Sequence, residues 1–373
     1  MKIIHTADIH LGRKFTKLGE KAGEQRQLLR DAFTKVVDLA CADDVDLLLI
    51  AGDLFDSNKV SKAEIEFARE QFEKLASHEK WVCISHGTHD ANDGLSVLNR
   101  DKFLNTFNNV ILFDNKKQSH NFPHLDLTVY GISNSANKGK DDPLAKVQKD
   151  DKAKYHIAMI HGSVAIESKH APDDWPIDPE KIKNSELNYI ALGHWHSTQD
   201  MSQGKVQAWY AGAPESIDYD EKGGNALEVS ITDKETKVKE IKVGQRNFDK
   251  IEIDVAEFAD YKDLKKAMIK GANKNLARQI ILKGLVGPEK MVDKKMLQEE
   301  LAANFYQVNI DIKNLHLDID NINEKDYPEE LVIGQYVRAL KKELSSAKND
   351  EEKAILEKAL HKGVALLSGK EIL

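Results

Sequence analysis

Apolar runs alternate with helical patterns along the first hundred residues of the chain. The runs KIIH, DLLLIAGD and WVCIS have the length and apolar character of strands that are buried on both faces. Between them, Gln25–Ala40 and a segment that begins at Ser61 have the spacing of amphipathic helices, and Glu64, three residues after Ser61, predicts a capping box. This order of elements predicts a largely parallel sheet with helices on its faces.

Further short apolar runs continue to about residue 231: VILF, LTVYGI, HIAMIHG, YIALGHWH, VQAWYAG and ALEVSI. No long helical pattern separates the last of them, so we expect a second sheet that is more antiparallel than the first. For residues 1–245 we therefore predict an α/β fold, a β-sandwich of two sheets flanked by helices.

The pattern restarts after residue 245. Three strand-like runs, KIEIDV, QIILKGL and QVNIDIK, alternate with helical segments around Tyr261–Asn275 and Lys294–Asn304, which predicts a small α+β domain at residues 246–325. The stretch from Lys262 to Lys295 holds ten Lys or Arg against three acidic residues. Such a stretch forms either a contact surface for phosphates or an ordinary solvated helix face.

Two amphipathic segments, near residues 330–345 and 350–367, predict a helical hairpin for residues 326–373. Each segment has one apolar stripe, formed by Ile333, Val337, Leu340 and Leu344 in the first and by Leu356, Leu360, Val364 and Leu367 in the second. Two helices of this length cover each other only in part and are marginal alone in water. Some of their apolar surface must therefore contact another body, either the preceding small domain or a partner protein.

Composition narrows the class of protein. The chain has 373 residues, 41% hydrophobic and 31% charged, with a formal net charge of −8, which is typical of a globular protein with more than one domain. No apolar stretch reaches the roughly 18 residues of a transmembrane helix, and Asp8, His10 and Arg13 interrupt any signal-peptide core. The two cysteines, Cys41 and Cys83, lack metal or redox spacing. We expect a cytoplasmic protein in a reducing compartment, with no membrane partner.

Five of the apolar runs end in aspartate or histidine, usually beside a glycine that permits a sharp turn. The residues at these ends are Asp8 and His10, Asp53, His89 and Asp90, His161, and His194 and His196. Each alone has an ordinary explanation, such as a turn residue or a hydrogen-bonded core histidine. Because ligands bind beyond the carboxyl ends of strands in open α/β sheets, five such ends together predict a metal site. Asp53 is the natural bridge between two divalent cations, since a carboxylate offers one oxygen to each.

Five motifs of the chain resemble, in their order, those of the calcineurin-like metallophosphoesterases: D-x-H, G-D-x-x-D, G-x-H-D, a lone His-Gly and G-H-x-H. The segments HTADIHLG, AGDLFD, ALGHWH and YAGAPES more closely resemble the SbcD-type nuclease subunits of bacterial and archaeal double-strand-break repair complexes. The similarity runs to about Ile231. The order of a small capping domain and then a helical tail is also similar to that family.

The resemblance implies a role for each residue. Asp8, His10, Asp53 and His196 would hold one metal, and Asp53, His161 and His194 would hold the other, with manganese as the family's usual ion. His89 would be the general acid or a phosphate contact, and Asp90 would orient it. The implied activity is two-metal hydrolysis of DNA phosphodiester bonds, as an exonuclease or endonuclease. The implied partners are DNA, an ABC-type repair ATPase with a coiled coil (SbcC-like) that docks on residues 326–373, and a second copy of the chain.

One position departs from the family pattern. The family has G-N-H-D, with the Asn carbonyl as a ligand of the second metal, whereas this chain has Thr88 in Gly87–Asp90. A threonine hydroxyl is shorter and a poorer donor than an amide oxygen, so the second metal should be held less tightly, with Thr88 as a weak ligand at most. Two other functions therefore stay open: a catalytically weakened scaffold of the same fold, and a small-molecule phosphodiesterase, against which the capping domain and tail count.

Overall fold

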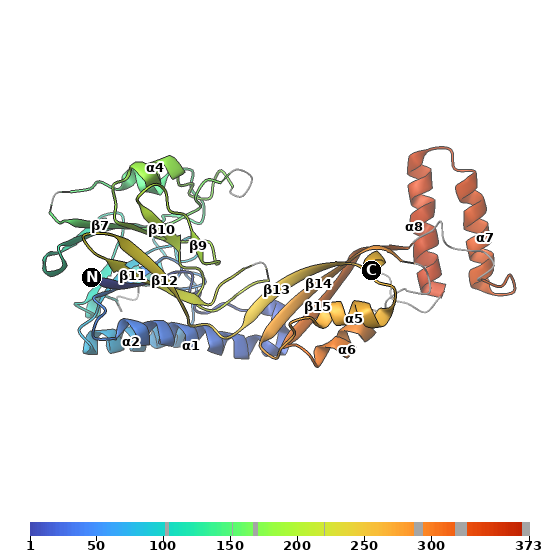
Figure 1. The fold of residues 1–373 in the computed structure, drawn as a ribbon, viewed down its shortest axis with the longest axis horizontal. Coiled ribbons are helices and arrows are strands. Elements are labelled where there is room, and N and C mark those ends of the chain that lie inside the picture. The colour runs from blue at the N-terminus through green and yellow to red at the C-terminus, as the bar shows by residue number, and fades with distance from the viewer. Residues whose placement is uncertain are drawn as a thin grey trace. The chain divides into compact units, whose positions relative to one another are not determined.

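The computed structural model describes residues 1–100, 104–150, 152–166, 171–219, 221–286, 294–317 and 327–367. They form two compact units, Met1–Asn247 and Phe248–Leu373 (Figure 1). Within the described ranges, no helix has both the length and the apolar character needed to cross a membrane.

The first unit contains two six-stranded sheets. The first has the strand order β12-β11-β1-β2-β3-β4. Its parallel strands are β1 (Lys2–Thr6), β2 (Leu47–Ala51), β3 (Trp81–Ser85) and β4 (Val110–Leu112), and β11 (Asn225–Ile231) pairs antiparallel with both β1 and β12 (Thr236–Lys242). The helices α1 (Ala22–Ala40) and α2 (Lys62–Ser77) pack on this sheet (Figure 1).

The predicted capping box at the start of α2 forms in part. The Ser61 hydroxyl accepts a hydrogen bond from the backbone N–H of Glu64 (3.3 Å), as expected. The Glu64 carboxylate instead binds the Arg30 guanidinium, with Nη2 to Oε1 at 2.6 Å. Glu64 therefore links α2 to α1.

The second sheet has the order β5-β6-β7-β8-β10-β9. Its strands are β5 (Ser119–Phe122), β6 (Leu127–Ile132), β7 (Tyr155–His161), β8 (Tyr189–Gly193), β9 (Gln199–Asp200) and β10 (Gln207–Tyr210). The four central strands β6, β7, β8 and β10 are parallel, and only the edge strands β5 and β9 are antiparallel. In the described residues each sheet has three parallel and two antiparallel strand pairs, so our expectation that the second sheet is more antiparallel than the first is wrong.

The connections explain this error. The described residues of the crossovers between β6, β7 and β8 are irregular chain with two short helical pieces, η4 (Pro143–Lys146) and α4 (Pro179–Asn184). A parallel pair needs a long crossover, and that crossover does not have to be a regular helix. The run ALEVSI, expected in the second sheet, forms β11 and pairs with β1 of the first sheet.

The two sheets pack face to face, and their central strands are buried on both faces. Ile3, Leu47 and Leu49 belong to the core between the sheets, whereas the alternate residues Ile4 and Leu48 face the helices. This double burial accounts for the unbroken apolar runs. The sandwich of two sheets with flanking helices agrees with the predicted fold class. Cys83 lies in the core between the sheets and is a free thiol.

The second unit contains a three-stranded sheet of β13 (Asn247–Asp254), β14 (Leu276–Val286) and β15 (Gln307–Leu317), with helices α5 (Tyr261–Ile269) and α6 (Lys294–Ala302). The strands β14 and β15 are parallel. The helix predicted to continue to Asn275 ends at Ile269, because Gly271 adopts a left-handed conformation (φ 75°) that terminates helices. Residues 287–293 of the basic stretch lie outside the described residues.

The predicted hairpin consists of α7 (Val332–Ser345) and α8 (Asp350–Leu367). Val337, Leu360 and Val364 are fully buried between them, and five further side chains pack around these three: Tyr327, Ile333, Tyr336, Leu340 and Leu344. Other apolar side chains stay exposed, namely Leu331, Val332, Ile355, Leu366 and Leu367. The helices therefore pack on each other along Val337, Leu360 and Val364, whereas Leu367, which belongs to the predicted apolar stripe of the second segment, is exposed.

Candidate metal centre

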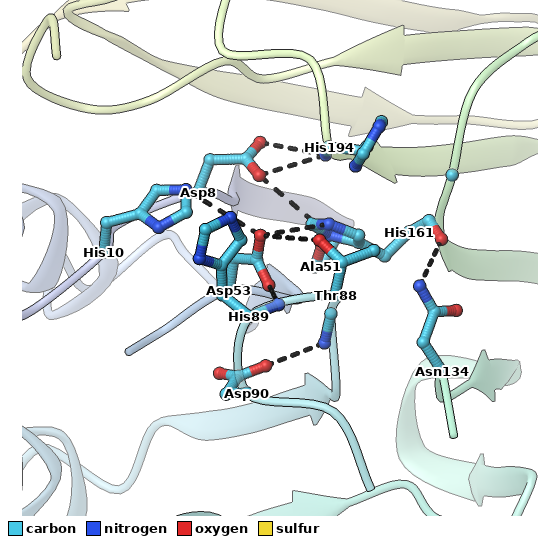
Figure 2. A network of polar contacts seen from close by, with 12 residues as sticks. Asp8, His10, Ala51, Asp53, Thr88, His89, Asp90, Asn134, His161 and His194 are labelled. Carbon is cyan, nitrogen blue, oxygen red and sulfur yellow. Dashed lines mark hydrogen bonds and ion pairs between the residues drawn. The ribbon is translucent and has the colours of Figure 1, made fainter. Parts of the chain in front are cut away.

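Neighbouring strands of both sheets present their carboxyl ends at one place. Asp8 and His10 follow β1, Asp53 follows β2, and Thr88, His89 and Asp90 follow β3, while His161 ends β7 and His194 and His196 follow β8 (Figure 2). Backbone hydrogen bonds hold the first two loops together, from Asp8 N–H to Gly52 O (3.2 Å) and from His10 N–H to Asp53 O (3.0 Å). The convergence of five strand ends predicted from the sequence is thus present.

Glycine at two strand ends permits the close approach of the sheets. A Cβ on Gly193 would lie 2.0 Å from the Ala51 carbonyl oxygen, and one on Gly52 would lie 2.4 Å from Nδ1 of His161. Any side chain at these positions would force apart the ends of β2, β7 and β8. These two glycines therefore set the size of the site.

Four of the candidate ligands adopt backbone conformations that residues other than glycine rarely have. The φ values are 53° for Asp8, 51° for His10, 53° for Asp53 and 110° for His194. Each such conformation costs about 1–3 kcal/mol and persists only where the surrounding structure imposes it. Their concentration at this one place is typical of a functional site.

The described residues contain three groups of side chains whose possible ligand atoms lie within 4.8 Å of one another. They are Asp8, His10 and His196; His10, Asp53 and His89; and Asp8, Asp53 and His161. Asp53, Asp8 and His10 each belong to two of these groups, so the three groups form one connected cluster. Both predicted sets differ in part. Asp53 is absent from the group of Asp8, His10 and His196, and in the second set Asp53 and His161 group with Asp8, while His194 belongs to none of the three.

The imidazoles of His10 and His196 point at each other. Their Nε2 atoms lie 3.1 Å apart, and the rings meet edge to face. The other ring nitrogen of His196, Nδ1, contacts Oε1 of Glu221 at 2.6 Å. His10 Nδ1 lies 3.3 Å from Oδ1 of Asp56. Each ring thus has a carboxylate behind it, which leaves one nitrogen directed into the site.

His161 and His194 are held by other partners. His161 Nδ1 contacts the carbonyl oxygen of Ala51 (2.9 Å), and its Nε2 lies 3.2 Å from Oδ2 of Asp53. His194 receives support at Nε2 from Oδ2 of Asp174 (2.9 Å), while its backbone N–H donates to the Asp8 carboxylate. His194 lies beside His161, with ring centroids 5.3 Å apart.

Asp53 is the most heavily contacted carboxylate of the site. Its Oδ1 accepts the backbone N–H of His89 (2.7 Å), and its Oδ2 is 3.4 Å from the hydroxyl of Thr88, which donates to it. Thr88 is buried, so its hydroxyl is directed inward toward the site (Figure 2). The residue that replaces the family's asparagine therefore contacts the predicted bridge.

His89 and Asp90 have different surroundings. The His89 ring is exposed, lies 4.6 Å from the His10 ring and contacts the Asp56 carbonyl oxygen through Nδ1 (2.9 Å). Asp90 is fully buried and accepts the backbone N–H groups of Gly87 (2.8 Å) and Phe55 (3.2 Å). Asp90 thus holds the loops around His89, and the hydrogen-bonding partner of the His89 ring is Asp56.

The charges of the site are strongly coupled. Burial would raise the pKa of Asp53, but His161, His10 and His89 outweigh burial and hold that pKa well below its usual value. Burial disfavours the charged form of His161, yet the Asp53 carboxylate raises the pKa of His161 to about 10. Burial raises the pKa of Asp90 to about 7, and the Asp53 charge adds to this effect. A buried anion surrounded by imidazoles is an environment suited to cations.

The donor set fits divalent cations. Mixed carboxylate oxygens and imidazole nitrogens suit manganese, iron and zinc, and a shared carboxylate can join two of them. His10 and His196 direct two nitrogens at one point, where a cation can bind the lone pair of each ring. Residues from five strands therefore meet in an arrangement that can hold a metal pair.

Sequence reasoning missed the two carboxylates behind the GHWH histidines. Asp174 lies 20 residues before His194 and Glu221 lies 25 residues after His196, both in irregular segments. Neither follows an apolar run, so the signal that identified the other residues was absent. Only the folded chain brings them to the site.

A two-sheet sandwich with clustered Asp and His at its strand ends defines a metal-binding hydrolase fold, and comparison with known proteins specifies the family. The model of the calcineurin-like phosphoesterase family matches residues 1–198. This match covers more than half of the chain, and the chain therefore belongs to that family, whose members use divalent metals.

Several curated proteins are similar to the chain. It is 28% identical over 218 residues to the uncharacterized metallophosphoesterase YhaO of Bacillus subtilis, which covers 57% of this chain and 52% of that protein. It is 26% identical to the DNA double-strand break repair protein Mre11 of Sulfolobus acidocaldarius, over 58% of this chain and 55% of that protein. The matches thus span about half the length of these two relatives.

A longer match exists to the DNA double-strand break repair protein Mre11 of Sulfurisphaera tokodaii, 24% identical over 87% of this chain and 82% of that protein. Among solved structures, the protein TT1561 of Thermus thermophilus is similar with a TM-score of 0.40 and 11% identity, over 65% of this chain and 98% of that one.

Proposed function

We propose that this chain is a DNA nuclease that hydrolyses phosphodiester bonds with two divalent cations, and that Mn²⁺ is the preferred ion. The observation that carries this proposal is that the three groups of possible ligands share members. Asp53 joins His10 and His89 in one group and Asp8 and His161 in another, while Asp8 and His10 join His196 in the third. His194 completes the second set through the ring nitrogen that Asp174 leaves open. Thr88 is at most a weak additional ligand.

When bound, the two cations would lower the pKa of a shared water and neutralise charge on the scissile phosphate. His89 supplies the proton for the leaving group. Its Nδ1–H donates to the Asp56 carbonyl oxygen, and its exposed ring leaves Nε2 available to substrate. In the imidazolium form, Nε2–H gives its proton to the departing 3′ or 5′ oxygen, and the ring returns to the neutral Nδ1–H tautomer. Asp90 supports this step by holding the loop that carries His89.

DNA is favoured over a small phosphodiester by the second unit. A hydrolase of small phosphodiesters needs neither the three-stranded domain nor the hairpin. The Mre11 relative from Sulfurisphaera tokodaii is named for double-strand break repair, and its match covers 87% of the chain, so it extends into the second unit. These points support a repair nuclease as the particular role, and the SbcD type is proposed from the sequence motifs alone.

The basic stretch of the second unit contributes less free charge than its composition implies. Lys265 pairs with Glu300, Lys283 pairs with Glu252, and Arg278 is buried and bound to Asp249 at 2.6 Å. Lys262 and Lys270 are exposed on α5 and directly after it. The proposed DNA contact therefore rests on such exposed lysines.

The hairpin is proposed as the docking site for the ATPase. Both helices of the hairpin have exposed apolar side chains. The proposed partner segment is a coiled coil of an ABC-type repair ATPase, and we propose that an apolar face of this coiled coil packs on the apolar side chains of the hairpin. The proposal includes a homodimer, for which light scattering of the purified full chain is the direct measurement.

The test compares three activities of the purified full chain with Mn²⁺: hydrolysis of bis-p-nitrophenyl phosphate, of single-stranded DNA and of duplex ends. A DNA nuclease cleaves the DNA substrates, and its activity disappears with chelator and returns with Mn²⁺. Hydrolysis of bis-p-nitrophenyl phosphate alone would instead identify a small-molecule phosphodiesterase. Activity on no substrate would identify a scaffold.

A further inference from the structure

The two histidines of the Gly193–His196 segment are each held by a carboxylate that lies far away in the chain. His194 Nε2 contacts Oδ2 of Asp174 at 2.9 Å, and His196 Nδ1 contacts Oε1 of Glu221 at 2.6 Å. The four side chains are between 18% and 28% exposed, so water competes little for these contacts. Neither carboxylate belongs to any of the three ligand groups.

The two carboxylates hold opposite ring nitrogens. A neutral imidazole has one N–H and one lone pair, so the nitrogen that donates to a carboxylate determines which nitrogen can bind a cation. Glu221 takes Nδ1–H of His196 and leaves Nε2, which is directed at His10 Nε2 (3.1 Å). Asp174 takes Nε2–H of His194 and leaves Nδ1. The two histidines of the Gly193–His196 segment are thus opposite tautomers, and the lone pair lies on Nε2 of His196 and on Nδ1 of His194.

Asp174 is itself held rigidly. Its Oδ2 accepts the hydroxyl hydrogen of Ser163 at 2.5 Å, and the Ser163 oxygen accepts the indole N–H of Trp195 at 2.9 Å. Trp195 lies between the two histidines in the chain and packs against the Tyr210 ring. The chain of contacts Asp174–Ser163–Trp195 therefore orients the whole segment from one side, and Glu221 orients it from the other.

We propose that Asp174 and Glu221 are positioning residues that set the metal affinity of two different positions of the site. Glu221 acts through His196 on the position formed with Asp8 and His10. Asp174 acts through His194 on the position formed with Asp53 and His161. This inference rests on the proposed two-metal function. Carboxylates that orient a metal-binding histidine typically change metal affinity about 10–100-fold when they are lost.

The test measures Mn²⁺ binding to the full chain by isothermal titration and by the loss of the free-Mn²⁺ electron paramagnetic resonance signal. The variants are Glu221→Gln and Asp174→Asn, which keep size and remove charge, and their combination. Matched controls are Asp173→Asn, beside Asp174 and paired with exposed Lys138, and Asp218→Asn, near Glu221 and paired with Lys17. Thermal unfolding without metal establishes that each variant is folded.

The wild type should bind two equivalents in two steps. Glu221→Gln should weaken one step about 10–100-fold, Asp174→Asn should weaken the other to a similar extent, and the double variant should weaken both. The controls should bind as the wild type does. If Asp174→Asn does not fold, Ser163→Ala replaces it. This variant removes the hydrogen-bond donor to Asp174 and should weaken the binding step that is expected to depend on Asp174.

The outcomes separate this inference from the function on which it rests. A wild type that binds fewer than two equivalents refutes the two-metal function and the inference with it. If the wild type binds in two steps and both variants keep the affinities of these two steps, the inference alone is refuted. The inference is also refuted if both variants weaken the same step, or weaken both steps equally, because a general structural role would have that effect.

Discussion

Replacing Asp53 with asparagine removes one negative charge from the centre of the site and keeps the shape of the side chain. Asparagine also tolerates the left-handed backbone that Asp53 adopts (φ 53°). The change removes a ligand that belongs to two of the three groups of possible metal donors. Each bound cation contributes several kcal/mol to stabilising the transition state. We therefore expect kcat to fall at least about a thousandfold, since each 1.4 kcal/mol is a factor of about ten.

The same substitution has a bounded effect on stability without metal. The Asp53 carboxylate, 3.2 Å from His161, raises the pKa of that imidazole from 6.5 to about 10. Burial opposes this effect of Asp53, and the net shift in the pKa of His161 corresponds to roughly 4 kcal/mol at pH 7, where the unfolded histidine is mainly neutral. Asparagine also avoids the cost of burying a charge, so the net loss should be smaller and the variant should stay folded.

The assay is hydrolysis of bis-p-nitrophenyl phosphate and single-stranded DNA over a range of Mn²⁺ concentrations, with urea unfolding measured in parallel. Asp46→Asn is the matched control, since Asp46 precedes β2 at its amino end whereas Asp53 follows β2 at its carboxyl end. The control should keep full activity. Manganese-dependent activity that survives Asp53→Asn in a folded protein would refute the two-metal assignment.

Three further outcomes are expected. Thr88→Asn should restore an amide ligand and lower the Mn²⁺ concentration for half-maximal rate roughly tenfold; an unchanged or higher concentration would show that the threonine has another role. The raised pKa of His161 contributes stability that is fully present below pH 6.5 and is lost as the pH rises through about 10. With chelator present, the urea concentration at the unfolding midpoint should therefore fall between pH 7 and pH 10. His161→Gln should remove this dependence of the midpoint on pH. Deletion of residues 329–373 should leave cleavage of short single strands nearly unchanged and abolish ATPase binding in a pull-down; unfolding or loss of basal cleavage would place the hairpin in the core.

The main error in the predicted fold concerns connections rather than elements. Strand positions follow from unbroken apolar runs, because a strand covered on both faces needs apolar side chains at every position. Strand direction in the second sheet did not follow, since irregular crossovers around η4 and α4 replace the helices that normally mark a parallel sheet. The capping residue Ser61 behaved as predicted, whereas its partner Glu64 binds Arg30, a residue of another helix.

The parts of the site that lie at strand ends can be predicted from the sequence alone, because the side chain that follows a buried apolar run must emerge at the edge of a sheet. Asp8, Asp53 and His161 are of this kind. The tertiary structure alone decided which ring nitrogen of each histidine faces the centre, because that choice depends on partners distant in the chain. Asp174 and Glu221 lie in irregular segments without periodic pattern, and only the packing of the two sheets brings their carboxylates to His194 and His196.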